Sequence, residues 1–564
     1  MAEEPRRRAR HDGVLAVLAA AAIGCLYLFF AGRSTLWDRD EPRFARATVE
    51  MVESGNYLYT TFNGRLRPDK PILVYWLMAL AVRVLGPTEL AFRFFSALGT
   101  VATCLLTWHM GRKLFGPKAA LWAMLMLAAT PMMFVLGTLA TADAIMLPLV
   151  TAGLACFVAS LGKGGRALPL AQLAAFTGLA MLAKGPLGGV PLIVIATAVA
   201  IGRRSIGLGG RYLLGCILAT MVGAAIFCAW FVPANQATGG ELLRLGVGHH
   251  VVGRVWRPLE RHGGDFLLYL PYYVPVVLAG FFPWVLYLPG AISAMLGGRL
   301  GGRRGRAVLL AMILPVPVIM TFVATKLPHY VLPIWPGLAL AVAATIEAAQ
   351  AGTLTQRDRR WLGRGVRLLG IGAVVVGTGA VIASWLAPLP ALRVGGTVVG
   401  AMLVVMTLLA MWAHGTRGPQ AGALVLLVGM VLLGPAVHLL ITPAVERTKI
   451  VPAIARRITA AAPPQTPVAT YGFDEPSLNL YVGRPIRSFW REHAAPAQVL
   501  AWLREPHDGV LVLTGRTLRA LTAGRGGIQA DVLAAGAGVN YTKMEWLYLV
   551  VLRRRAAGPT SRPR

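Results

Sequence analysis

Residues 37–46, WDRDEPRFAR, directly follow the first hydrophobic segment and organise the rest of the chain. The stretch is densely charged, although charged residues make up only 14% of the sequence. Further carboxylates follow in the same loop at Glu50, Glu53, Asp69 and Glu89. Acidic side chains beside a membrane are costly to hold there and usually serve a function. The loop is therefore the first candidate for a functional site.

The composition is that of a polytopic membrane protein. The 564 residues are 56% hydrophobic, the mean hydropathy is +0.62, and several apolar runs reach the ~20 residues that cross a hydrocarbon core. The net charge of +31 lies mostly in short basic tracts between apolar runs. This pattern is typical of topology and of contact with anionic membrane lipids, and it argues against nucleic-acid binding. The five cysteines all lie in apolar runs without a CxxC pair, so no disulfide framework is expected.

The positive-inside rule decides the topology. A basic tract at residues 6–10 precedes an apolar run at 13–31 that has no A-x-A cleavage site, which predicts an uncleaved first helix with a cytoplasmic start. The acidic loop then lies outside. The apolar stretch 71–85 is short for a span, and if it crossed, the later basic tracts would face outward. We therefore predict an interfacial helix on the outer surface at 71–85.

The predicted fold is an α-helical membrane domain, residues 1–442, followed by a small outward-facing α/β domain, residues 443–564. About 13 crossings are expected, with the candidate catalytic loop at about 32–89. After the first helix the spans are placed at 90–111, 118–137, 144–161, 168–183, 186–201, 212–233, 267–295, 307–325, 329–348, 367–387, 391–413 and 420–441. The last domain is predicted from short alternating strands at 467–471 and 509–513 and a helical pattern at 495–504.

The acidic motif DRDE at 38–41 allows three interpretations. It can be a solvated turn that caps a helix over about 42–52. It can be the D-x-D metal clamp of nucleotide-sugar enzymes, which the outward position disfavours because nucleotide sugars are cytoplasmic. Or one carboxylate, Asp40 or Glu41, can be a general base beside a membrane-embedded substrate, with Arg43 nearby.

Other polar groups on the outer side also have two interpretations each. Asp143 is the only acid between Glu89 and Glu241, and it is either a helix cap or a functional acid at a membrane edge. Lys70 in RPDKP is either a snorkelling anchor or a phosphate contact.

Two later outward segments carry further candidates. The loop 234–266 includes His250, Arg254 and Arg257, and it either binds lipid headgroups or offers an imidazole to a distant carboxylate. In KLPHYVLP, residues 326–333, prolines interrupt two spans around Tyr330. Such breaks are tolerated where they line a cavity.

Motifs for nucleotide-driven or metal-driven hydrolytic chemistry are not found in a credible context, including Walker A, H-E-x-x-H and G-x-S-x-G. No nucleotide cofactor is therefore expected, and the energy for a reaction must arrive with the substrate. An outward site of this kind favours a lipid-linked donor.

Taken in order, these motifs resemble the GT-C glycosyltransferases of the protein O-mannosyltransferase and lipid A aminoarabinose transferase superfamily. The resemblance covers nearly the whole membrane portion. It is carried by D-E-x-R at 40–43, K-P at 70–71, L-A-T-x-D at 139–143, the outer loop with His250, and LPHYVLP at 327–333. The family places its Lys-Pro helix at the outer membrane face, which agrees with the interfacial helix predicted at 71–85.

The resemblance implies roles for individual residues. Asp40 matches the essential acid of the family's Asp-Glu motif, and Glu41 stands beside it. The positions implied or proposed to bind the donor phosphate and substrate are Arg43, Lys70, Asp143, Arg254, Arg257 and Tyr330. Asp69 and His250 match the positions between which a metal is placed in the aminoarabinose enzyme, so the resemblance implies a divalent metal, zinc or magnesium, at these residues. Aspartate is one methylene shorter than the family's glutamate, so the metal requirement stays open.

The sequence thus predicts an inverting glycosyltransferase. Its donor would be a sugar on a polyprenyl phosphate such as undecaprenyl phosphate, and its acceptor lipid A or another envelope glycolipid. The expected location is a bacterial inner membrane, with the active site and the C-terminus in the periplasm and membrane lipids around it. Two alternatives are a protein O-glycosyltransferase of the same fold and a lipid or glycan transporter, although a transporter predicts inverted repeats and mid-span charges that the sequence lacks.

Overall fold

The computed structural model describes residues 3–37, 39–162, 165–256, 269–489, 491–505, 508–523, 530–541 and 545–554, without the side chains of 3–11 and 250. These residues form two compact units. The membrane unit comprises Met1–Arg33 and Pro68–Ile441, and the α/β unit comprises Ser34–Arg67 and Thr442–Arg564. Each unit is described by itself.

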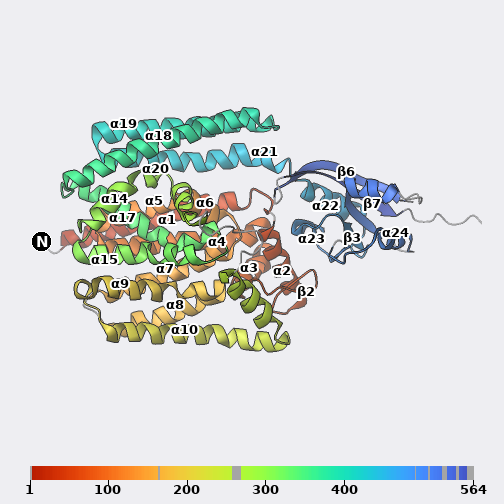
Figure 1. The fold of residues 1–564 in the computed structure, drawn as a ribbon, viewed down its shortest axis with the longest axis horizontal. Helices are drawn as coiled ribbons and strands as arrows, with labels where there is room; N and C mark the ends of the chain where they lie inside the picture. Colours follow the sequence, from red (N-terminus) through yellow and green to blue (C-terminus); the bar gives the residue numbers. More distant parts are fainter. Residues whose placement is uncertain are drawn as a thin grey trace, which may run out of the picture. The chain divides into compact units, whose positions relative to one another are not determined.

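The membrane unit consists of helices in the described residues (Figure 1). Its elements are α1 (Glu3–Ala31), α3 (Leu73–Leu85), α4 (Glu89–Leu114), α5 (Pro117–Ala128), α6 (Pro131–Thr138), α7 (Ala142–Ser160), α8 (Ala167–Lys184), η1 (Gly185–Gly189), α9 (Val190–Ile206), α10 (Gly210–Ala237), η2 (Leu242–Gly253), α11 (Arg254–Trp256), α13 (Tyr273–Gly280), η3 (Trp284–Tyr287), α14 (Leu288–Leu296), α15 (Gly302–Ile313), α16 (Pro315–Phe322), η4 (Pro328–Ile334), α17 (Trp335–Gln350), α18 (Gln356–Leu386), α19 (Ala391–Arg417), α20 (Pro419–Ala436) and η5 (Val437–Ile441). Helices α18, α19 and α20 pack side by side in sequence order.

The number of membrane-crossing helices follows from length and composition. Within the described ranges, ten helices are long and apolar enough to cross a membrane, and twelve if each of two bent helix pairs is one span. One of the ten is the 40-residue stretch Ala167–Ile206, which as a single helix would be about 60 Å long, roughly twice a hydrocarbon core. The chain instead folds back at η1, where a Cβ on Gly188 would lie 2.4 Å from the Met181 nitrogen. Counting α8 and α9 separately adds one crossing to the twelve and agrees with the sequence prediction.

Helix α3 is too short to span. Its 13 residues extend about 20 Å, less than the ~30 Å of a hydrocarbon core. The interfacial helix expected at 71–85 corresponds to this element.

Close packing between α4 and α7 fixes the start of α7. A Cβ on Gly99 would lie 2.3 Å from the Ala144 carbonyl oxygen, so a larger residue there would push the two helices apart. Small residues at such crossings let helix backbones approach in membranes. The first turn of α7, which carries Asp143, therefore has a well-defined position in the bundle.

The C-terminal part of the α/β unit is a five-stranded mixed sheet with helices on both faces, and it confirms the small α/β domain expected after residue 442. Its elements are α21 (Thr442–Glu446), α22 (Ile450–Ala461), β3 (Val468–Tyr471), α23 (Pro476–Val482), β4 (Ile486–Ser488), α24 (Pro496–Arg504), β5 (Val510–Thr514), α25 (Gly515–Thr522), β6 (Ala530–Asn540) and β7 (Glu545–Arg554). The strand order is β4-β3-β5-β7-β6, with β4, β3 and β5 parallel and the last two strands antiparallel. The sheet has an apolar core on each face. One core packs against α22 and α23, and the other packs against α24 and α25.

The acidic loop belongs to this α/β unit over residues 34–67, whereas the sequence analysis assigned the whole loop 32–89 to the membrane domain. The loop segment contains α2 (Asp40–Ser54) and a small hairpin, β1 (Thr61–Phe62) with β2 (Arg65–Leu66). The Asn63 side chain donates to the Ile486 carbonyl at 2.7 Å and accepts from the Ile486 N–H at 2.8 Å. These bonds join the hairpin turn to the edge strand β4, 423 residues further along the chain.

Candidate active site

The membrane unit holds a buried carboxylate at the start of α7, with a lysine and a histidine side chain beside it. Thr141 caps this helix by accepting from the Ala144 N–H, so the side chain of Asp143 is available for other partners. Lys184, at the end of α8, forms a short ion pair with Asp143, and both side chains are more than nine-tenths buried. The His329 Nε2 atom lies 3.9 Å from the other Asp143 oxygen. A helix cap is therefore not the role of this acid.

Tyr330 connects this pair to a second cation. The Arg254 guanidinium donates to the Tyr330 hydroxyl at 3.3 Å, and the Lys184 ammonium lies 5.4 Å from the centre of the Tyr330 ring. The Thr325 N–H donates to the Arg254 carbonyl at 3.1 Å, which joins α11 to the segment before η4. Arg254 and Tyr330 are thus positioned by backbone contacts as well as by their own hydrogen bond.

Lys70 is electrostatically coupled to the same group. It lies before α3, outside the membrane-spanning helices, and is partly buried. Burial, together with repulsion from Lys184 and Arg254, lowers the pKa of Lys70 to about 8, while Asp69 and Asp143 act in the opposite direction. Lys70 and Lys184 therefore both act on the Asp143 carboxylate, and Arg254 acts on Lys70. This concentration of positive charge suits an anion such as a phosphate. We call Lys70, Asp143, Lys184, Arg254, His329 and Tyr330 the cationic cluster.

The sequence analysis singled out four members of the cationic cluster and missed two, Lys184 and His329. Lys184 ends the span predicted at 168–183, and the predicted topology puts that end outside. A lone lysine there runs against the positive-inside rule, which is the pattern that could have revealed it. His329 lies within the motif at 326–333. The neighbouring Lys326 instead donates to the Val323 and Met320 carbonyls, at 2.7 and 3.2 Å, at the end of α16.

The α/β unit presents the acidic motif at the start of α2. Asp40 is the first residue of this helix, its side chain is 77% exposed, and Arg43 lies 3.9 Å away. Glu41 is buried, and its carboxylate accepts the Trp37 N–H at 2.9 Å. Of the two acids that the sequence analysis proposed as catalytic, Asp40 is therefore the exposed one, and Glu41 closes the turn in front of α2.

A metal at Asp69 and His250 stays a prediction. Arg257 and the His250 side chain lie outside the described residues. Among the residues that the structure does describe, no group of three or more His, Cys, Asp or Glu side chains could hold a metal ion. Asp69 is partly buried next to Lys70. The described donors alone do not make up a metal site.

Comparison with known proteins first defines a class. Residues 69–230 match the family model described as dolichyl-phosphate-mannose-protein mannosyltransferase. This range runs from just before α3 into α10 and includes Asp69, Lys70, Asp143 and Lys184. The membrane unit is thus similar to a glycosyltransferase family over the part that carries three of the six residues of the cationic cluster.

More particular similarities are to undecaprenyl phosphate-alpha-4-amino-4-deoxy-L-arabinose arabinosyl transferases. The protein from Proteus mirabilis is 28% identical over 59% of this chain and 60% of its own length, and that from Edwardsiella ictaluri is 28% identical over 55% and 56%. The chain thus aligns with less than two thirds of the length of these curated relatives.

The solved structures agree with the fold over nearly the whole chain. ArnT from Cupriavidus metallidurans bound to undecaprenyl phosphate superimposes with a TM-score of 0.76 and 21% identity, covering 97% of this chain and 99% of that protein. Its apo state gives the same TM-score at 22% identity. The chain therefore has the ArnT fold, and the resemblance inferred from the sequence motifs is confirmed.

Proposed function

We propose that the chain is an inverting glycosyltransferase that moves a sugar from undecaprenyl phosphate to lipid A or another envelope glycolipid. The observation that carries this proposal is the cationic cluster, in which Lys184 pairs with one buried carboxylate, Lys70 interacts with both, and Arg254 interacts with Lys70 and Tyr330. A polyprenyl-phosphate donor leaves as a phosphate anion, and fixed cations stabilise the charge that develops on it. The relatives' names favour 4-amino-4-deoxy-L-arabinose as the sugar.

The reaction balances without a further cofactor. The acceptor hydroxyl oxygen attacks the anomeric carbon, and its proton passes to Asp40. The bond between the anomeric carbon and the phosphate oxygen breaks, and undecaprenyl phosphate departs with the electron pair. Lys70 and Arg254 neutralise the phosphate, and Tyr330 orients Arg254. Direct displacement by the acceptor inverts the anomeric centre.

The proposed setting is the periplasmic face of a bacterial inner membrane. Its support is the sequence topology, in which the basic tracts remain cytoplasmic and the acidic loop and the C-terminal part lie outside. The membrane unit supports a multi-pass protein through its apolar helices.

Mass spectrometry of lipid A, core glycolipid and envelope proteins tests the function. The samples come from cells with the chain, without it, and with the Asp40→Ala variant. We expect a sugar mass on lipid A that is lost in the deletion and in the variant. A mass change confined to envelope proteins would show that the acceptor is a protein and not a glycolipid. The name of the matching family model favours this alternative. No change in any fraction, with the chain expressed, would contradict a transferase.

The pKa of Lys70 predicts a pH dependence. Its pKa is near 8, so Lys70 is charged below about pH 8 and becomes neutral above it. We expect kcat/KM for the donor to fall as the pH rises through about 8, because this ratio reports groups in the free enzyme. Lys70→Arg keeps its charge to higher pH and should move the fall upward. The measurement is a kcat/KM profile from about pH 6 to pH 10, and a profile that is the same in wild type and Lys70→Arg would contradict phosphate binding by Lys70.

A further inference from the structure

We infer that Lys449 is a positioning residue that holds the Asp40 turn in place, so that the C-terminal part of the chain is needed for turnover but not for donor binding. The inference rests on the proposed function, because it takes Asp40 as the proton acceptor. Nothing in the sequence motifs points to Lys449, which lies 409 positions after Asp40. The contacts that carry it all lie within the α/β unit.

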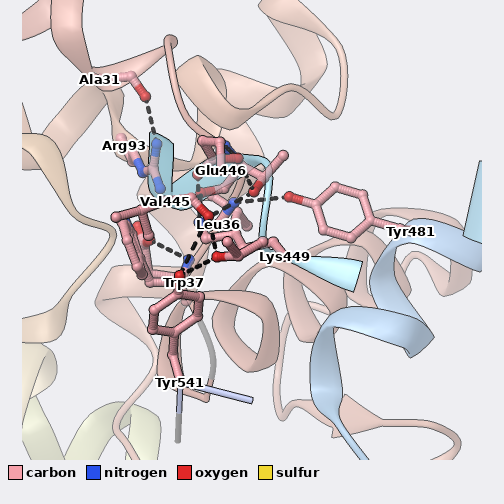
Figure 2. Close-up of polar contacts among 12 residues, drawn as sticks. Ala31, Leu36, Trp37, Arg93, Val445, Glu446, Lys449, Tyr481 and Tyr541 are labelled. Carbon is pink, nitrogen blue, oxygen red and sulfur yellow. Dashed lines mark hydrogen bonds and ion pairs between the residues drawn. The ribbon is translucent and has the colours of Figure 1, made fainter. Parts of the chain in front are cut away.

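The first contact joins the beginning of the acidic loop to the end of α21. Glu446 accepts from the Thr35 hydroxyl at 2.7 Å and from the Thr35 N–H at 3.4 Å. The Lys449 ammonium is 2.6 Å from the other Glu446 oxygen and donates to the Thr35 carbonyl and hydroxyl, each at 3.2 Å. Figure 2 shows the dashed contacts of Glu446 and Lys449 around this stretch. We call Thr35, Glu446 and Lys449 the tether.

The second contact fixes the aromatic residue two positions on. The Lys449 ammonium lies 3.6 Å from the centre of the Trp37 ring, and the Tyr541 ring packs edge-on against Trp37 at 5.7 Å. The Tyr481 hydroxyl accepts the Leu36 N–H at 2.8 Å (Figure 2). A cation over an indole face is favourable, more so when it is shielded from water. The side chain of Lys449 is only 8% exposed, so this cation is shielded.

A third contact joins Trp37 to the first turn of α2. The Trp37 N–H donates to Glu41, which is 2% exposed and stands next to Asp40 in the first turn of the helix. The other end of the segment is also attached, because Glu50 accepts from the Thr61 hydroxyl and the Asn63 N–H, each at 2.7 Å. Asn63 in turn binds β4, as described above. The α2 helix is therefore held at both ends.

The chemistry of the tether suits positioning better than simple stability. Replacing a buried ion pair with apolar groups is often neutral for stability, whereas its geometry can specify one arrangement. All three ammonium protons of Lys449 have acceptors in reach, in Glu446, Thr35 and the Trp37 ring. A displacement of about 1 Å at a reacting group costs on the order of 10²-fold in rate.

The test is Lys449→Met in the full-length chain, assayed in vesicles with the undecaprenyl-phosphate sugar and lipid A. We expect kcat to fall about 10–100-fold, with KM for the donor changed less than about 2-fold, and Lys449→Arg to restore part of kcat. The matched control is Arg553→Met, which breaks the ion pair with Asp508 in the same unit without touching the tether. Wild-type kcat in Lys449→Met, or an equal loss in Arg553→Met, would overturn the inference.

Hydrogen exchange gives a readout that does not depend on activity. In Lys449→Met, the Leu36 and Trp37 amides should exchange faster while the amides of β3 and β5 remain protected. Unchanged exchange at residues 35–41 would overturn the tether, even if the wild type showed no transfer and the proposed function itself failed. Thr35→Val removes the hydroxyl contacts without removing a charge, so it repeats the test should Lys449→Met fail to fold.

Discussion

Replacing Asp40 with Asn should lower kcat by about 10²–10⁴-fold, the usual range for one positioned proton acceptor, while donor binding changes little. Asn has nearly the same shape, but its amide cannot take the proton of the acceptor hydroxyl. The Asp40 side chain is 77% exposed at the first position of α2, so the substitution leaves no unpaired buried group. The measurements are single-turnover transfer rates and the affinity for undecaprenyl phosphate.

Glu41→Gln is the matched control for Asp40→Asn. The amide oxygen of Gln can still accept the Trp37 N–H that Glu41 now accepts. We expect Glu41→Gln to keep most of the activity. If it were inactive and Asp40→Asn fully active, the assignment of the two acids would have to be reversed.

Replacing Lys184 with Met should lower the free energy of unfolding by about 3–5 kcal/mol, the usual cost of leaving one member of a buried ion pair uncompensated. Both side chains of the pair are more than nine-tenths buried, and His329 is a more distant partner at 3.9 Å. The variant also removes one cation from the cationic cluster. We therefore expect weaker donor binding, by about 10–100-fold, as for the loss of a hydrogen bond between charged groups. Thermal unfolding in detergent and donor titration measure the two effects.

The double variant Asp143→Asn/Lys184→Met separates stability from binding. Removing both charges should recover most of the lost stability, because no buried charge is left unpaired. Donor binding should stay weak, because the cation is still missing. If the stability losses of the two single variants simply added in the double variant, the ion pair would not be energetically significant.

The membrane fold was predictable from the sequence because hydrophobic runs, proline breaks and basic tracts are local patterns. The short helix α3 and the separate helices α8 and α9 were expected from length and charge alone, and the interfacial position of α3 stays a prediction. The cationic cluster was only partly predictable. Asp143 stood out as a lone acid, but its partner Lys184 is 41 residues away at the end of another helix, and proximity of that kind depends on packing.

The division of the acidic loop was not predictable from local patterns. Residues 34–67 pack with the C-terminal part through pairs such as Thr35 with Glu446, which are 411 residues apart. In the sequence, Thr35 and Glu446 each resemble an ordinary polar residue beside a helix. The same reason explains why Glu41 was grouped with Asp40 as catalytic, since its burial and its bond to the Trp37 N–H appear only in the folded unit.

The most direct test of the central claim is a transfer assay with purified full-length chain in vesicles, supplied only with the undecaprenyl-phosphate aminoarabinose donor and lipid A. Wild-type chain should produce sugar-bearing lipid A with inverted anomeric configuration and release undecaprenyl phosphate in equal amount, and Asp40→Asn should produce neither. Equal product from wild type and Asp40→Asn would contradict the role of Asp40. No product from folded, donor-binding wild type with any envelope acceptor would contradict the transferase itself.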